Sequence, residues 1–98
     1  GAHGQGGSQS EAERVPKVFV LESPDRAHAE QLRIFVSSLP VTGVIGGPEP
    51  RTMIEGRMYR VGDVVDESRR IVVLQIDMNT QSVAFGDAGG NIVQRVIE

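Results

Sequence analysis

The sequence predicts a small, mainly β domain: an antiparallel β-sandwich or partly open barrel of about six strands, with one amphipathic helix near the N-terminus. Three observations predict this fold. Short apolar segments alternate with turn-forming residues from residue 41 onward. The connections between these segments are brief, and brief connections join antiparallel strands, because parallel pairs need long crossovers. A single helical stripe of apolar residues precedes the strands.

The segment 52–65 shows the strand pattern most clearly and predicts a hairpin. Its turn is expected at Glu55-Gly56, between a strand over 52–54 and a strand over 57–61. A two-residue hairpin loop needs positive φ at one or both central positions, which glycine adopts at low cost. The residues Val61-Gly62-Asp63-Val64 predict a second reversal of the chain between apolar residues.

A helix over about residues 24–39 is predicted from its ends and its apolar period. Ser23 can cap it, Pro24 suits its first position, and Asp25 is favourable near the positive end of the helix dipole. The helix should end before Pro40, because a residue that precedes proline disfavours the α conformation. The apolar stripe consists of Leu32, Phe35, Val36 and Leu39. We expect it to pack on the domain's own core, the usual role of such a stripe, rather than on a partner.

The other strands are predicted from short apolar runs. The run 18–21 forms either a strand or an extended arm across the core, since four residues show no period. Strands are expected over 41–45, 83–86 and 92–97. The longest strand is expected over 71–78, with one face formed by Val72, Leu74, Ile76 and Met78.

The length of 98 residues suits one domain. Residues 1–14 are a glycine-rich lead-in with too little apolar surface to offset the entropy of ordering it, and Gly1 resembles a residue left behind by an expression tag. The folded domain is therefore expected over residues 15–98.

Charge and composition exclude several classes of function. The net charge of −3 and the isoelectric point of about 5.3 argue against a nucleic-acid binder, which needs a basic patch. The same charge gives no support to a polybasic membrane surface. There is no cysteine, so disulfides, thiolate metal sites and a cysteine nucleophile are excluded.

No group of residues predicts catalysis, a cofactor or a metal. The glycine clusters 43–47 and 86–90 lack the following helix and the lysine of a phosphate-binding loop, so they are interpreted as turns. His28 is the only histidine in the expected domain, whereas a metal site needs about three or four ligands. The carboxylates are expected mostly in turns, where they bond to backbone amides: Asp63, Asp66, Glu67, Asp77 and Asp87. We therefore expect a protein that is not an enzyme.

Two segments are candidate contacts for a protein partner. The first is an expected strand edge at Val41, Thr42, Gly43 and Val44. The second is the hairpin, where exposed Arg57, Tyr59 and Arg60 around Met58 resemble the composition of a protein interface. The alternative is that Met58 lies in the core and that Tyr59 and the arginines cover its rim, and we favour it because composition alone is weak evidence for an interface.

Three segments together resemble a known family. They are Val41-Thr42-Gly43-Val44, the hairpin from Pro50 to Val65 with Gly56 and Gly62-Asp63 at its turns, and Phe85-Gly86-Asp87-Ala88-Gly89-Gly90. This pattern resembles the periplasmic homology-region domains of the type II secretion inner-membrane linker and of PilP-like pilus-assembly lipoproteins of type IV pili. The family often has alanine where Thr52 or Met53 stands here, and the helix over 24–39 is not a firm part of its pattern.

The resemblance implies a non-catalytic β module on the periplasmic side of the inner membrane, tethered by an anchor that would precede residue 1. Its partner would be the periplasmic domain of a secretin or another linker protein. Binding through an exposed strand edge is physically reasonable, because unpaired amides and carbonyls can template a partner strand. The alternative is a cytosolic small-barrel module that binds a peptide or nucleic acid. An unrecognised hydrolase is disfavoured, because the sequence offers no pair of interacting titratable groups for a pocket.

Overall fold

A computed structural model describes residues 16–97 of the chain. The chain forms two antiparallel sheets and one helix, and the sheets do not close into a barrel. The predicted mainly β fold with a single helix is therefore confirmed. The predicted lead-in, residues 1–14, lies outside the described residues.

The larger sheet has five strands in the order β1-β8-β7-β6-β5, and the smaller has three in the order β2-β3-β4. We expected about six strands, whereas the described residues contain eight. In chain order they are β1 (Lys17–Glu22), β2 (Val41–Ile45), β3 (Arg51–Ile54), β4 (Arg57–Arg60), β5 (Val64–Asp66), β6 (Ile71–Asp77), β7 (Ser82–Gly86) and β8 (Ile92–Val96). The apolar run 18–21 thus joins the five-stranded sheet as edge strand β1.

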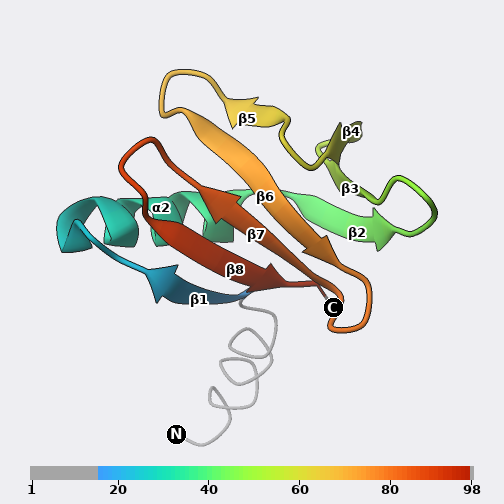
Figure 1. The fold of residues 1–98 in the computed structure, drawn as a ribbon, viewed down its shortest axis with the longest axis horizontal. Coiled ribbons are helices and arrows are strands. Elements are labelled where there is room, and N and C mark those ends of the chain that lie inside the picture. The colour runs from blue at the N-terminus through green and yellow to red at the C-terminus, as the bar shows by residue number, and fades with distance from the viewer. Residues whose placement is uncertain (1–15, 98) are drawn as a thin grey trace, which may run out of the picture.

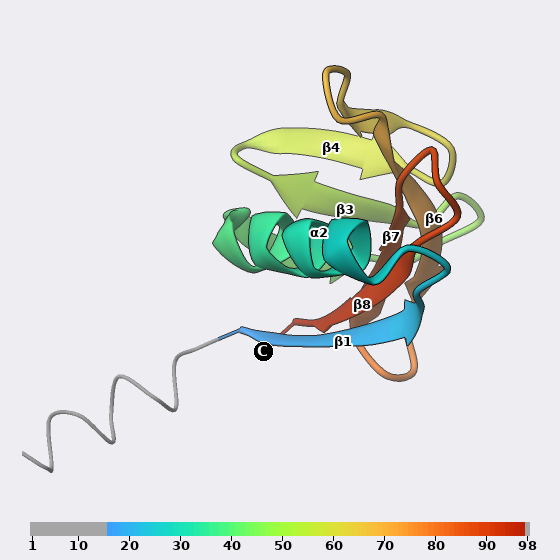
Figure 2. The same cartoon turned by 90° about the vertical axis from the view of Figure 1, so that its left-hand side faces the viewer.

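Helix α2 (Arg26–Ser38) covers one face of the five-stranded sheet. Figure 2 shows the helix beside that sheet, with β3 and β4 of the three-stranded sheet on one side of it and β1 on the other. The opposite face of the five-stranded sheet is turned toward the viewer in Figure 1, and no helix or sheet of the described residues covers it. One face of the sheet therefore forms the core, and the other lies at the surface.

The core lies between α2 and the inner faces of the two sheets. Leu32 and Val36 of the helix are buried, and Phe35 and Leu39 pack against the core as partly buried residues. The predicted apolar stripe therefore packs on the domain's own core. The sheets contribute the remaining buried members of this cluster, which are Val41, Ile54, Ile71, Val73, Val83, Phe85 and Val93.

The helix begins two positions later than the predicted cap implied, at Arg26 instead of Pro24. Asp25 is the N-cap, and its carboxylate accepts a hydrogen bond from the His28 backbone N–H at 3.2 Å. Ser23 was therefore wrongly predicted as the capping residue: it lies too far before the first turn to reach those amides. The helix ends at Ser38, before Pro40, as the sequence predicted.

The predicted turn between β3 and β4 is confirmed. Glu55 and Gly56 both have positive φ, 53° and 79°, which is the pattern of a two-residue turn matched to the twist of the strands. Gly62 also has a positive φ of 97°, at the second predicted reversal.

The prediction of a single shared face along β6 is wrong, because Val72 lies on the outer face of the sheet and Ile76 on the inner face. Ile71 and Val73 are buried, whereas Leu74 is exposed. The pairing of β6 with β7 shifts between Val73 and Gln75, so that Leu74 is an extra residue in a bulge, and Ile76 returns to the core. A bulge changes which side chains face inward, and strict alternation along the sequence cannot show where one occurs.

Candidate interaction surfaces

The hairpin strand β4 places its side chains differently from the sequence prediction. Arg57 and Arg60 are exposed as expected, but Tyr59 is half-buried and packs against the core. Met58, which the favoured interpretation placed in the core, is 47% exposed. The cause is the register: Tyr59 pairs with buried Thr52, and residues directly opposite each other share a face of the sheet.

An open depression of about 410 Å³ lies beside the hairpin. Arg57, Met58 and Tyr59 line it from β4, and Asp63 and Val64 line it from the chain that leads into β5. The depression therefore joins the predicted hairpin contacts to the edge of the five-stranded sheet.

Arg60 lies outside this depression and has local partners. Its guanidinium is 3.2 Å from the Glu49 carboxylate, and its backbone N–H donates to the Asp63 carboxylate at 2.8 Å. Arg57 is therefore the predicted arginine that adjoins the apolar residues of the depression.

The predicted strand edge at residues 41–44 is an edge of the three-stranded sheet, because β2 pairs only with β3 among the described strands. Val41 is buried and Val44 packs against the core, so neither side chain offers a free surface. Thr42 is exposed, and a Cβ added at Gly43 would meet nothing within 4 Å. The register shifts between Val41 and Gly43, and such a bulge makes an edge less regular for a partner strand.

Strand β1 is a second edge, which the sequence prediction did not treat as a contact surface. It pairs with β8 and with no other described strand. Phe19 and Leu21 are each 51% exposed and Val20 is 41% exposed, whereas Val18 packs against the core. A run of four apolar residues normally indicates burial, so its exposure could be recognised only from the position of the strand at the sheet edge.

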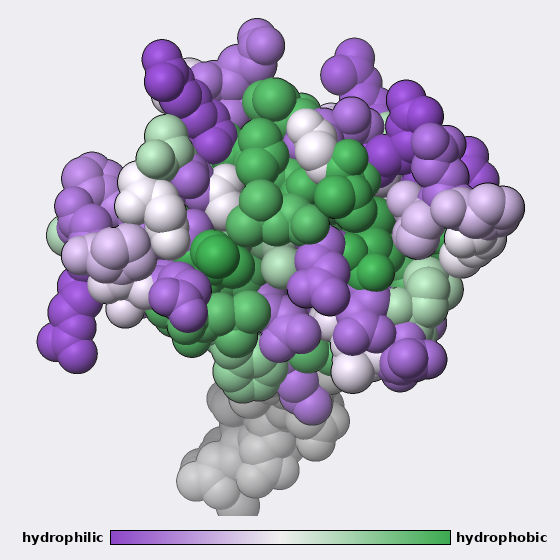
Figure 3. Space-filling view, in the orientation of Figure 1, coloured by the Kyte–Doolittle hydropathy of each residue, from purple (hydrophilic) through white to green (hydrophobic). Residues whose placement is uncertain are grey.

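The uncovered face of the five-stranded sheet carries a band of apolar side chains (Figure 3). Val64 on β5 pairs with Val72 on β6, and Val72 alternates with buried Val73, so Val64 and Val72 both lie on the outer face. Leu74 follows on the same strand and is 41% exposed. We call Met58, Val64, Val72 and Leu74 the β5–β6 surface, since the depression beside the hairpin links Met58 to Val64.

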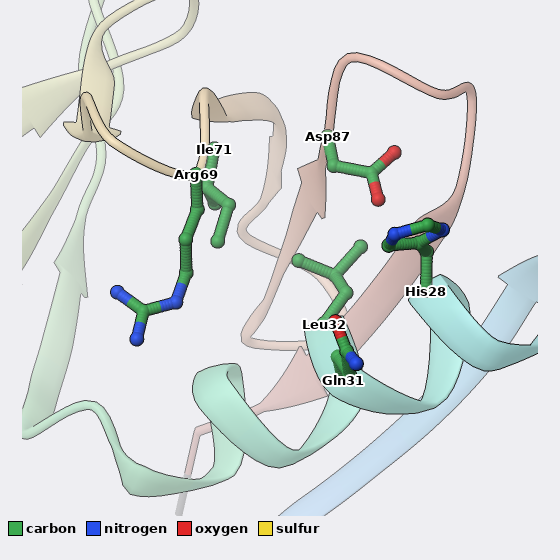
Figure 4. Close-up of a pocket in the computed structure, with 6 residues that line it drawn as sticks. All are labelled: His28, Gln31, Leu32, Arg69, Ile71 and Asp87. Atoms are coloured by element: carbon green, nitrogen blue, oxygen red, sulfur yellow. The ribbon is translucent and has the colours of Figure 1, made fainter.

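A smaller cavity of about 160 Å³ lies at the start of the helix. Figure 4 shows its lining: His28 and Leu32 on α2, Arg69 before β6, and Asp87 after β7, together with Gln31 and Ile71. Asp87 and His28 lie next to each other at one end of the cavity, and Arg69 lies at the other. Arg69 also stacks over the Phe35 ring, with its guanidinium carbon 4.7 Å from the ring centre.

The titratable groups near this cavity are engaged in local hydrogen bonds. His28 Nδ1 lies 2.6 Å from Asp25 Oδ2, and this side-chain hydrogen bond raises the pKa of His28 and lowers the pKa of Asp25. The Asp87 carboxylate accepts hydrogen bonds from the backbone N–H groups of Gly89 and Asn91, each at 3.0 Å. Asp25 and Asp87 thus serve as a helix cap and a turn former.

Two further observations concern metals and membranes. Within residues 16–97, no cluster of three or more His, Cys, Asp or Glu side chains is placed to hold a metal ion. In the same part of the chain, no helix has both the length and the apolar character required to cross a membrane.

Comparisons of the chain with protein-family models, with curated proteins and with solved structures gave no match. The resemblance to periplasmic homology-region domains therefore stays a prediction from the sequence motifs.

Proposed function

We propose that this chain is a non-catalytic protein-interaction module, and that its partner protein binds the β5–β6 surface. The observation that supports this most is the exposure of Val64 and Leu74 on a sheet face that no helix or sheet in residues 16–97 covers, with Met58 beside Val64 across the depression. Met58, Val64 and Leu74 are between 41% and 47% exposed. Contiguous exposed apolar surface is typical of an interaction site.

The composition of this surface favours a protein as the partner. A flexible methionine can adapt to the shape of a partner, and an arginine at the rim can bind carboxylates. Arg57 occupies that rim position, because it lines the depression together with Met58 and Val64. Interfaces between proteins are enriched in methionine and arginine around an apolar centre.

The setting that we propose is a bacterial secretion or type IV pilus complex in the cell envelope. This part of the proposal depends on the motifs at residues 41–44, 50–65 and 85–90. The partner would then be the periplasmic domain of a secretin or another linker protein. The alternative setting is the cytosol, with a peptide or nucleic acid as the ligand.

Site-specific photo-crosslinking in cells of the natural host tests the proposal. A photo-reactive amino acid at Leu74 or Met58 should form crosslinks to one envelope protein. The matched control is Ile34, which is 55% exposed on the helix and lies outside the β5–β6 surface, so it should give no crosslink to that protein.

Each other result contradicts a specific part of the proposal. Crosslinks to cytosolic proteins alone would exclude the envelope setting. Equal crosslinking from Ile34 and Leu74 would show that the β5–β6 surface is not selective. Salt-dependent binding of the purified protein to DNA or RNA, lost on introducing glutamates at Val64 and Leu74, would favour a nucleic-acid ligand.

A further inference from the structure

We propose that strand β1 pairs with β1 of a second copy of this chain, in antiparallel orientation. The two five-stranded sheets would then join edge to edge into one continuous sheet. This contact would lie at the opposite edge of the sheet from β5, so it is separate from the β5–β6 surface.

The first argument is the state of the β1 edge. Among residues 16–97, β8 is the only strand that pairs with β1, so the other edge of β1 has no partner strand. Natural proteins protect such edges with prolines, inward-pointing charges or bulges. No proline occurs between Lys17 and Glu22, and the irregular register lies near the end of the strand, between Val20 and Glu22. The first four residues of β1 therefore present a regular, unprotected edge.

The second argument is the apolar surface that this edge exposes. Phe19 pairs with Gln94, whose neighbours Val93 and Arg95 are buried, so Phe19 lies on the outer face of the sheet. Leu21 lies on the same face, where it lines a small depression with Ala84 and Gln94. Pairing two β1 strands would set Phe19 and Leu21 of one copy beside those of the other, so that cross-strand contacts would cover part of their exposed area.

The third argument is charge, and it identifies the partner. Strand β1 begins with Lys17 and ends with Glu22, with only apolar residues between them. When a strand pairs antiparallel with its own copy, the beginning of each strand lies beside the end of the other. Lys17 of each copy would therefore lie near Glu22 of the second copy, which gives two attractive contacts related by a two-fold axis. A parallel arrangement would bring like charges together instead.

The other sheet edges offer fewer regular backbone groups for pairing with a partner strand. Strand β5 has three residues and β4 has four, compared with six in β1. Strand β2 carries a bulge at its beginning, and two of its side chains are held in the core. Edge pairing depends on the number of regular backbone hydrogen bonds, so β1 is the best suited of the edges.

A charge-swap experiment tests this proposal. The association of the wild-type chain is measured by sedimentation equilibrium between about 10 μM and 1 mM, a range suited to a weak dimer. Lys17→Glu and Glu22→Lys should each weaken dimerisation by about tenfold or more, equivalent to ~1.4 kcal/mol, because each puts like charges together at both ends. An equimolar mixture of the two variants should form a mixed dimer, and the double variant Lys17→Glu/Glu22→Lys should dimerise like the wild type.

The controls separate this contact from other effects. Arg57→Glu changes the net charge by the same amount as Lys17→Glu but lies on β4, so it should leave dimerisation unchanged. A Val64→Glu/Leu74→Glu variant should also dimerise normally, since it alters only the β5–β6 surface. Circular dichroism confirms that each variant is folded.

Three results would overturn the proposal. They are a wild-type chain that remains monomeric at about 1 mM, a double variant that fails to recover dimerisation, and an Arg57→Glu variant that weakens association as much as Lys17→Glu. The first would remove the dimer itself. The other two would show that Lys17 and Glu22 do not face each other, and none of the three affects the function proposed for the β5–β6 surface.

Discussion

The side chain of Asn91 holds the start of helix α2 against the loop between β7 and β8. Its oxygen accepts a hydrogen bond from the backbone N–H of Asp25 at 3.1 Å, although the two residues are 66 positions apart. Its amide nitrogen donates to both carboxylate oxygens of Asp87, at 3.2 and 2.9 Å. Asn91 is completely buried, so these bonds are shielded from water.

We expect Asn91→Ala to lower the free energy of unfolding by about 2–3 kcal/mol, because it leaves buried polar groups without partners. Urea denaturation measures the change. The control is Asn79→Ala, since Asn79 lies in an exposed turn where its backbone N–H bonds to Asp77. That substitution should change stability by less than about 0.5 kcal/mol. A loss below ~1 kcal/mol for Asn91→Ala would contradict the proposed role.

The side chain of Arg95, on β8, caps the C-terminal end of helix α2. Its NH1 group donates to the carbonyl oxygen of Val36 at 2.8 Å and also to that of Leu39. The side chain is buried, and burial lowers the pKa of the guanidinium. Arg95→Met keeps the apolar stem but removes both hydrogen bonds, so we expect unfolding to become easier by about 1–3 kcal/mol. Thermal unfolding tests this, and a variant at least as stable as the wild type would show that desolvation of the charge outweighs the capping bonds.

The Asp25–His28 pair should make stability depend on pH. The pKa of Asp25 is lowered from 3.8 and that of His28 is raised from 6.5, so the pair stabilises the fold between about pH 3.8 and 6.5. Stability should fall below this window as Asp25 is protonated, and above it as His28 loses its proton. Both side chains are largely exposed, so the effect should shrink in about 1 M salt.

The substitution Asp25→Asn removes the negative charge but keeps the N-cap, because asparagine can still accept the hydrogen bond from the His28 backbone N–H. The difference in unfolding free energy between wild type and variant, measured from about pH 3 to pH 8, should be largest inside the window given by the two pKa shifts. A difference that is constant across this range would show that the ion pair does not contribute.

The turn between β3 and β4 contains a residue that is poorly suited to its backbone conformation. Glu55 has a φ of 53°, a region that asparagine tolerates better than glutamate. Glu55→Asn should raise the free energy of unfolding by about 0.5–1 kcal/mol, and Gly56→Ala should lower it by about 1 kcal/mol. Gly43→Ala is the control, since its φ is not positive and an added Cβ meets nothing within 4 Å. If Gly56→Ala costs no more than Gly43→Ala, backbone strain does not govern this turn.

Local chemistry allowed the helix and the hairpin to be predicted from sequence. The apolar period places Leu32 and Val36 on one side of a helix whatever surrounds it, and Pro40 prevents the helix from continuing. The Glu55-Gly56 pair likewise forms a tight turn through its own backbone preferences. These features depend on residues that are close together in the chain.

The choice of buried and exposed faces could not be predicted in the same way. Tyr59 and Met58 alternate along β4, and only the pairing of Tyr59 with Thr52 decides which of them turns inward. The bulge at Leu74 depends on how β6 aligns with β7, so strict alternation wrongly placed Val72 and Ile76 on the same face of the strand.

The sequence by itself therefore determined the mainly β class, the helix and the central turn, because periods and turns follow from neighbouring residues. Only the tertiary structure decided that β1 is an exposed edge, that Asn91 is buried, and that the β5–β6 surface lies uncovered. These properties depend on which distant strands pair and on where the helix packs. Such pairings are selected by the total burial and hydrogen bonding of the whole domain. They therefore cannot be read from any short segment of the sequence.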